Sequence, residues 1–169
     1  MRVLAFDPGY ERLGVAVVEK QGGKDVLLHS ECVRTAASLP FHERLAELGA
    51  AAEALIKTWQ PEAVALEEVF FEKNAKTAMQ VAEVRGMLSY IAAARRLALY
   101  QYKPAEVKIA VTGHGASDKK AVALMVPRLV AMSQKKRLDD ELDAIAIGLT
   151  CLASVRIPGL AESRYPQRN

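Results

Sequence analysis

Four acidic residues stand at the ends of predicted secondary-structure elements. Asp7 closes one apolar strand pattern and Glu67 closes a later one, while Asp140 and Asp143 share a face near the start of an apolar helix predicted over 139–155. Clustered carboxylates repel one another and are costly to bury unpaired, so a divalent cation is their natural partner. Hard oxygen ligands favour Mg²⁺ or Mn²⁺. Two such ions about 3.5–4 Å apart would support hydrolysis of a phosphodiester bond.

Each of these acids, taken alone, also fits an ordinary structural role. An acid at a strand end can cap or form an ion pair, and acids at a helix start complement the helix dipole. Glu68 follows Glu67 directly, and in a strand the two side chains point to opposite faces. One of the two is therefore expected to be the metal ligand and the other a solvated neighbour. Whether Glu68, or Asp139, the acid before Asp140, contributes to the metal site stays open.

The charge is unevenly distributed along the chain. The 169 residues (18.4 kDa) carry 23 Lys and Arg against 20 Asp and Glu, a net charge of +3. Residues 95–137 hold ten basic and two acidic residues, so this segment is +8 and the remainder is −5. A basic segment beside an acidic remainder suggests a polyanionic partner and a site that concentrates carboxylates. A solvated charged surface is the alternative reading.

Length and composition limit the class of protein. The chain fits one domain, which we expect over 1–157, followed by a polar, flexible tail over 158–169. No apolar run approaches the roughly 18 residues that a membrane span needs. The start of the chain has no signal-peptide layout, which predicts a cytoplasmic protein. Cys32 and Cys151 form neither a disulfide framework nor a metal knuckle, so we expect two buried thiols.

The hydrophobic pattern predicts an α/β fold with a mixed five-stranded sheet. Three strands joined by a Gly-Gly turn form an antiparallel meander, and two later strands, each following a helix, run parallel. The strands are expected over 2–7, 13–18, 26–34, 63–66 and 99–102. The helices are expected over 40–59 and 74–97, from Pro104, from a cap at Ser117 or Asp118 through Met132, and over 139–155.

An ordered set of short motifs then resembles one known family. The set runs from near the start of the chain to about Val155: D-P-G at 7–9, A-L-E-x-V-F at 65–70, K-N-A at 73–75, R-G at 85–86, Y-x-P-x-x-V-K at 102–108, G-x-G at 113–115, Lys119, and D-x-x-D-A at 140–144. Any one motif identifies little, but their order and spacing resemble the RuvC family of Holliday junction resolvases, within the ribonuclease H-like superfamily.

The resemblance implies a fold, a reaction and the residues that carry it. It implies a ribonuclease H-like, Mg²⁺-dependent endonuclease that resolves four-way DNA junctions by paired symmetric nicks, in recombination and repair. Two Mg²⁺ ions per site, replaceable by Mn²⁺, would be held by the family's acids, which fall on Asp7, Glu67, Asp140 and Asp143. The DNA contacts would fall on Phe70, Phe71, Arg85, Lys108, Lys119 and Lys120. The implied partners are a second copy of the chain and a RuvA-RuvB type branch-migration complex.

The long helix predicted over 74–97 is the candidate for the dimer contact. It carries more apolar residues than one stripe against a sheet requires, and a second copy would bury the excess. A helix covered on both sides within the monomer is the alternative. For the function, the alternatives are a junction-binding protein without catalysis and, less favoured, a phosphotransferase of the actin-like fold. The latter needs two such domains, which 169 residues cannot hold.

Overall fold

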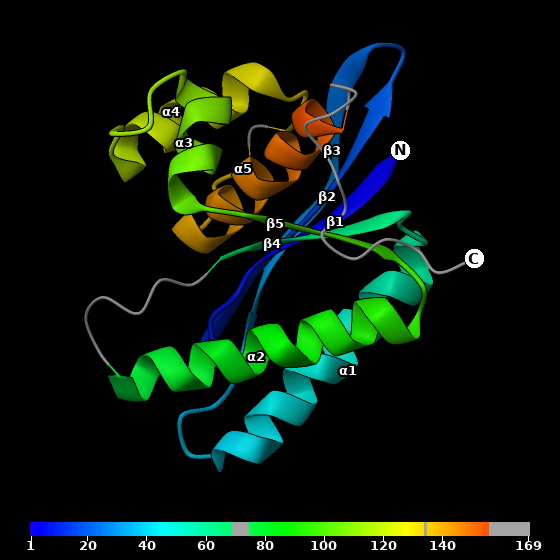
Figure 1. Ribbon diagram of the computed structural model, residues 1–169, viewed down its shortest axis with the longest axis vertical. Helices are drawn as coiled ribbons and strands as arrows, with labels where there is room; N and C mark the ends of the chain where they lie inside the picture. Colours follow the sequence, from blue (N-terminus) through cyan, green and yellow to red (C-terminus); the bar gives the residue numbers. More distant parts are fainter. Residues whose placement is uncertain (69–74, 134, 156–169) are drawn as a thin grey trace.

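The computed structural model describes residues 1–68, 75–133 and 135–155, and it arranges them in three layers (Figure 1). A central five-stranded sheet lies between α1 and α2 on one face and α3, α4 and α5 on the other. The strands are β1 (Arg2–Asp7), β2 (Arg12–Gln21), β3 (Lys24–Arg34), β4 (Ala63–Glu67) and β5 (Ala98–Tyr102). The helices are α1 (Phe41–Trp59), α2 (Ala75–Ala94), α3 (Pro104–Thr112), α4 (Lys119–Leu129) and α5 (Asp139–Ser154).

The sheet has the order β3-β2-β1-β4-β5. The first three strands pair antiparallel, whereas β1, β4 and β5 run parallel. The predicted mixed sheet of five strands is therefore confirmed. In the β1–β4 ladder Phe6 lies opposite Leu66, so the carboxyl ends of the two strands meet at one edge of the sheet.

Several predicted boundaries are wrong. β2 and β3 extend further than expected, to Gln21 and from Lys24, and join through Gly22 and Gly23, whose positive φ angles suit glycine. The helix α4 stops at Leu129 rather than at Met132. The chain beyond it becomes extended and pairs with the edge strand β3, because the Leu27 N–H donates to the Ala131 carbonyl over 3.1 Å.

The start of α4 resolves a choice that the sequence left open. Asp118, and not Ser117, is the N-cap of this helix: its Oδ1 accepts a hydrogen bond of 2.8 Å from the Ala121 N–H. The expected start of the long helix at Asn74 and the expected tail over 158–169 lie outside the described residues.

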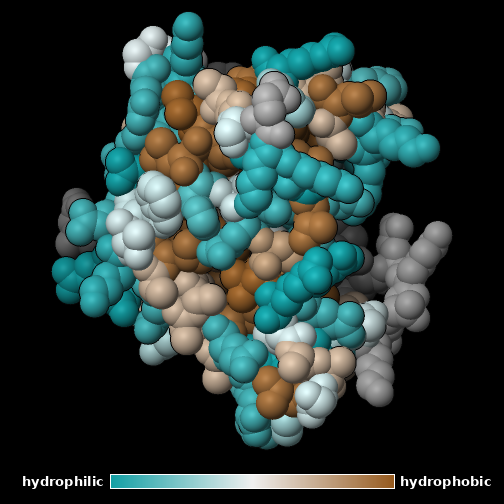
Figure 2. Space-filling view, turned by 180° about the vertical axis from the view of Figure 1, so that it is seen from behind, coloured by the Kyte–Doolittle hydropathy of each residue, from teal (hydrophilic) through white to brown (hydrophobic). Residues whose placement is uncertain are grey.

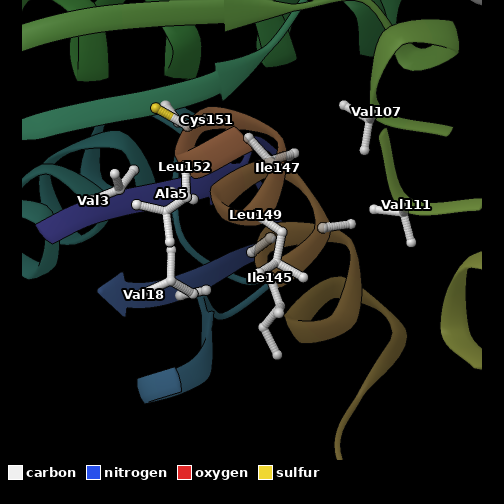
Figure 3. Packing of buried hydrophobic residues seen from close by; sticks show 14 of the residues in the cluster. Val3, Ala5, Val18, Val107, Val111, Ile145, Ile147, Leu149, Cys151 and Leu152 are labelled. Atoms are coloured by element: carbon white, nitrogen blue, oxygen red, sulfur yellow. The ribbon is translucent and has the colours of Figure 1, made fainter. Parts of the chain in front are cut away.

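Alternating side chains of the sheet build two hydrophobic cores. On β1, Leu4 and Phe6 face α1 and α2, while Val3 and Ala5 face the other layer. That second core is centred on α5, whose side chains lie against β1 and β2 in Figure 3. The helix approaches so closely that a Cβ atom at Gly148 would lie 2.7 Å from Val18 Cγ2. Glycine at this position therefore lets α5 lie directly on the sheet.

Exposed hydrophobic side chains occur on both outer layers. Figure 2 shows hydrophobic residues between hydrophilic ones on the reverse face of the molecule. The largest exposed examples are Met79 and Tyr90 on α2 and Leu124 on α4, with 64%, 73% and 68% of their surface accessible. Within the described ranges, no helix is long and apolar enough to cross a membrane.

Candidate active site

The carboxyl ends of β1 and β4 bring Asp7 and Glu67 to the same edge of the sheet. Asp7 is the last residue of β1 and Glu67 is the last residue of β4, and these strands are parallel neighbours. Both side chains are partly buried. The two acids lie close together because neighbouring strands of this parallel ladder end at the same level.

The start of α5 places two further acids beside this edge. Asp140 lies in the first turn and Asp143 is the fifth residue of the helix, which runs away from the site across β1 and β2. The approach depends on Gly14, opposite Asp7 in the β1–β2 ladder. A Cβ atom at Gly14 would lie 2.1 Å from the main-chain oxygen of Asp140. Only glycine lets the helix start come this close to β2, beside Asp7.

Three of the four acids line an open pocket of about 220 Å³ together with two lysines. The pocket is lined by Asp7, Glu67 and Asp143, by Lys108 of α3 and by Lys119 at the start of α4. Lys119 Nζ lies 3.1 Å from Asp143 Oδ2 in an ion pair. The structure therefore brings together three predicted acids and two predicted DNA-contacting lysines that are distant in sequence.

The electrostatics of this pocket are those of crowded carboxylates. Burial, followed by the charges of Asp143 and Glu67, raises the pKa of Asp7 to about 7. Burial and the charge of Asp143 also raise the pKa of Glu67, against the opposing effect of Lys119. The hydrogen bond and charge of Asp143 raise the pKa of Lys119. The site thus holds more negative charge than its own cations neutralise.

This donor set fits a hard divalent cation. Carboxylate oxygens on rigid strand and helix ends are the ligands that Mg²⁺ and Mn²⁺ prefer. A cation would relieve the repulsion that raises the pKa values of Asp7 and Glu67. Over residues 1–68, 75–133 and 135–155, however, no three Asp, Glu, His or Cys side chains are already gathered closely enough to hold a metal ion. The Asp143 carboxylate is engaged with Lys119 in this arrangement.

Asp140 differs from the other three acids because its carboxylate has partners of its own. Its Oδ2 lies 3.5 Å from Nη1 of Arg12 and accepts a long hydrogen bond of 4.0 Å from Cys32 Sγ. It does not line the pocket, although its charge contributes to the raised pKa of Asp7. Sequence reasoning missed Arg12 and Cys32. The sequence held no signal for the Arg12 contact, because the strand pairing that sets Arg12 opposite Arg34 and near Asp140 is known only from the structure.

The remaining predicted contacts are dispersed around the site. Arg85 of α2 donates through Nη2 to Gln101 Oε1 over 2.7 Å, and its charge opposes the rise that burial causes in the pKa of Glu67. Lys120 lines a smaller neighbouring pocket of about 100 Å³ with Asp139. Phe70 and Phe71 lie outside the described residues. Of the two cysteines, Cys151 is buried as expected, but Cys32 is only half-buried, which corrects that prediction.

The chain is similar to proteins of one known family. Residues 3–151 match the family model described as crossover junction endodeoxyribonuclease RuvC. The chain is 36% identical over 163 residues to the RuvC crossover junction endodeoxyribonuclease of Syntrophomonas wolfei, covering 96% of this chain and 95% of that protein. It is 41% identical over 154 residues to the one from Moorella thermoacetica, covering 91% and 92%.

A solved structure gives the same result in three dimensions. The chain superimposes on T. thermophilus RuvC in complex with Holliday junction substrate with a TM-score of 0.86 and 36% identity, covering 92% of this chain and 95% of that one. The fold is therefore the ribonuclease H-like fold expected from the motifs. The chain belongs to the RuvC family of crossover junction endodeoxyribonucleases.

Proposed function

We propose that this chain resolves four-way DNA junctions by hydrolysing one phosphodiester bond in each of two opposing strands. The observation that carries the proposal is the pocket at the end of β1 and β4, where Asp7, Glu67 and Asp143 meet Lys108 and Lys119. A phosphodiester nuclease needs acids for a metal and cations for phosphate, and this pocket offers both. Membership of the RuvC family supports the junction as substrate.

The four acids are proposed to bind two Mg²⁺ ions, for which Mn²⁺ can substitute. Asp7 lies near the other three acids, since the charges of Asp143, Glu67 and Asp140 all raise its pKa. The metal supplies activation of the attacking water and stabilisation of the leaving oxygen. For Asp140 to join the set, its carboxylate has to exchange Arg12 for the cation. This exchange costs little, because the Arg12 side chain is 56% exposed.

The two lysines are proposed to position the scissile phosphate. Lys108 is partly buried at the pocket, whereas the Lys119 side chain is 81% exposed and able to move from Asp143 to a phosphate oxygen. Such contacts give affinity that is independent of sequence and falls with salt. Arg85 and Lys120, together with Phe70 and Phe71, are proposed to contact the junction further from the cut.

A dimer is needed because one chain offers one such site and resolution takes two cuts. We propose a C2 homodimer that uses the exposed face of α2. Val84 and Leu88 of this helix are buried in the monomer, but Met79 and Tyr90, eleven residues apart, are exposed and lie on one face. Two such faces would cover each other. By family resemblance, the dimer is expected to act in the cytoplasm with a RuvA-RuvB type branch-migration complex.

The direct test is a nicking assay on synthetic DNA. A four-way junction, a linear duplex and a single strand are each incubated with the protein in Mg²⁺, in Mn²⁺ and in EDTA. The proposal predicts paired nicks in the junction alone, and only with a metal, while junction binding persists in EDTA. Binding without cleavage in either metal would instead support a non-catalytic junction-binding protein. The family match over residues 3–151 favours the nuclease over an actin-like phosphotransferase.

A further inference from the structure

Glu141 of α5 lies between the two site acids in the sequence but does not line the pocket. Glu141 follows Asp140 directly, and only 5% of its surface is exposed. Among the described residues, it is the most deeply buried acidic side chain. A buried carboxylate is costly unless its oxygens are hydrogen-bonded, so its partners indicate its role.

Both oxygens of Glu141 have partners from different parts of the fold. Oε2 accepts a 2.7 Å hydrogen bond from Ser30 Oγ in the middle of β3. Oε1 accepts a 3.3 Å hydrogen bond from the Leu138 N–H, which caps the start of α5. The carboxylate therefore ties the first turn of the helix to an edge strand more than a hundred residues away.

Arg137 extends this connection to the segment before the helix. Its Nε donates to Ser30 Oγ over 3.0 Å, so the hydroxyl accepts one bond and donates the other. Its Nη1 donates to the carbonyls of Ser133 and Lys135, at 2.9 and 3.1 Å. The segment that leads into α5 is thus held by the same hydroxyl that holds Glu141.

We propose that Glu141 is a positioning residue for the metal-binding acids. Through Ser30 and Leu138 it fixes the first turn of α5, and through that turn it sets where the carboxylates of Asp140 and Asp143 stand relative to Asp7. The inference rests on the proposed function, which assigns those acids to the metal.

The contacts of the site acids themselves cannot supply this rigidity. Asp143 pairs with Lys119 and Asp140 with Arg12, and both of these cations have most of their side-chain surface exposed. Exposed ion pairs contribute little to a fixed geometry. Gly14 lets the helix start lie against β2 but makes no bond to hold it. The buried Glu141–Ser30 bond is the contact that holds the turn in place.

The test compares three variants with a matched control. Glu141→Ala removes the clamp, Ser30→Ala removes its partner, and Glu141→Gln keeps an acceptor for one of its two donors. The control is Thr150→Val, which removes a buried hydrogen bond to the Ala146 carbonyl on the same helix but further from the acids. For each protein, Mn²⁺ affinity is measured by electron paramagnetic resonance, junction affinity in EDTA by gel shift, and nicking by single turnover.

The proposal predicts a defect in metal binding that is separate from DNA binding. Glu141→Ala should weaken Mn²⁺ binding by about tenfold and slow nicking by about a hundredfold, the effect of a displacement of about 1 Å at the site. Junction affinity in EDTA should stay within about twofold, because phosphate contacts dominate it. Ser30→Ala should act in the same direction, Glu141→Gln should recover part of the Mn²⁺ affinity, and Thr150→Val should match the wild type.

Two outcomes would overturn the proposal. One is unchanged Mn²⁺ affinity in folded Glu141→Ala or, if that variant does not fold, in Ser30→Ala. The other is a loss of junction affinity that parallels the loss of Mn²⁺ affinity. It would mean that Glu141 and Ser30 serve DNA binding through Arg137. If the wild type does not nick junctions at all, the proposed function fails, and the Mn²⁺ comparison still decides whether Glu141 positions the acids.

Discussion

The two helical layers that cover the sheet differ in what their helices bring to its edge. On one face, α1 and α2 contribute buried apolar side chains such as Leu48 and Leu88. On the other, α3, α4 and α5 build an equally apolar core but also bring Lys108, Lys119 and Asp143 to the ends of β1 and β4. The polar residues lie near the starts of α4 and α5 and in the middle of the short helix α3, whereas the middle of α5 is as deeply buried as the sheet itself.

The comparison shows how one fold separates stability from chemistry. Helix starts carry partial positive charge and unpaired N–H groups, so acids are tolerated there that the middle of a helix would exclude. Within a single turn of α5, Glu141 is buried with both oxygens bonded, while Asp143 faces an open pocket with one exposed lysine. In the proposed role of Glu141, the buried acid positions the acid that faces the pocket.

The largest expected effect distinguishes two adjacent acids at the end of β4. Glu67→Gln should lower the nicking rate by about a thousandfold, because a metal ligand supplies several kcal/mol of transition-state stabilisation. Glu68→Gln should lower it by less than about threefold. Single-turnover nicking of a synthetic junction measures both. An inactive Glu68→Gln beside an active Glu67→Gln would show that Glu68, and not Glu67, is the metal ligand.

A smaller effect is expected at the lysines of α4. Lys119→Ala should slow nicking by about a hundredfold, the usual loss when one charge-stabilising group is removed. Lys120→Ala, which alters the neighbouring smaller pocket, should slow it by about twofold. The same single-turnover assay at fixed salt compares them. Equal losses in the two variants would indicate a diffuse basic surface instead of a defined phosphate contact.

The outer faces of the two layers should respond differently to a new charge. Tyr90→Glu on α2 should weaken dimerisation by about a hundredfold, because it places an unpaired charge in the proposed contact. Leu124→Glu on α4, which is exposed to a similar extent, is the matched control and should remain dimeric. Sedimentation equilibrium gives both dissociation constants. Dissociation of the α4 variant alone would move the interface to the other layer.

The smallest effect concerns stability and pH without metal. The pKa of Asp7, raised to about 7, means that the folded chain keeps a proton that the unfolded chain releases above pH 4. The free energy of unfolding in EDTA should therefore fall as the pH rises from about 4 to about 7. Asp7→Asn should raise the free energy of unfolding by about 2 kcal/mol at pH 7.5 and leave it unchanged near pH 3.5. Urea titrations at both pH values check this, and a pH-independent gain would contradict it.

Strand-end acids were predictable because they depend on pattern alone. Asp7 and Glu67 each end an apolar run, and the parallel ladder places such ends together. The polar ends of β2 and β3 were not predictable in this way. Beyond Val18 the hairpin is held by backbone pairing through Lys20 and Asp25, and not by buried side chains, so hydrophobicity did not mark its length.

The different roles of the acids of α5 could not be predicted from the sequence. Asp140, Glu141 and Asp143 look alike as acids at a helix start. Their separate roles depend on what each meets: Arg12 from β2 for Asp140, Ser30 from β3 for Glu141, and the pocket for Asp143. These neighbours are distant in the chain and are fixed only by tertiary packing.

The Asp7→Asn variant tests whether the acids at the ends of β1 and β4 and near the start of α5 serve a metal for cleavage and not DNA binding. Nicking of a synthetic junction in Mg²⁺ and junction affinity in EDTA are measured on the same preparation. We expect a loss of nicking of about a thousandfold or more, with junction affinity unchanged or slightly tighter, because a negative charge near DNA has been removed. A parallel loss of binding and nicking would contradict it and make Asp7 a structural residue.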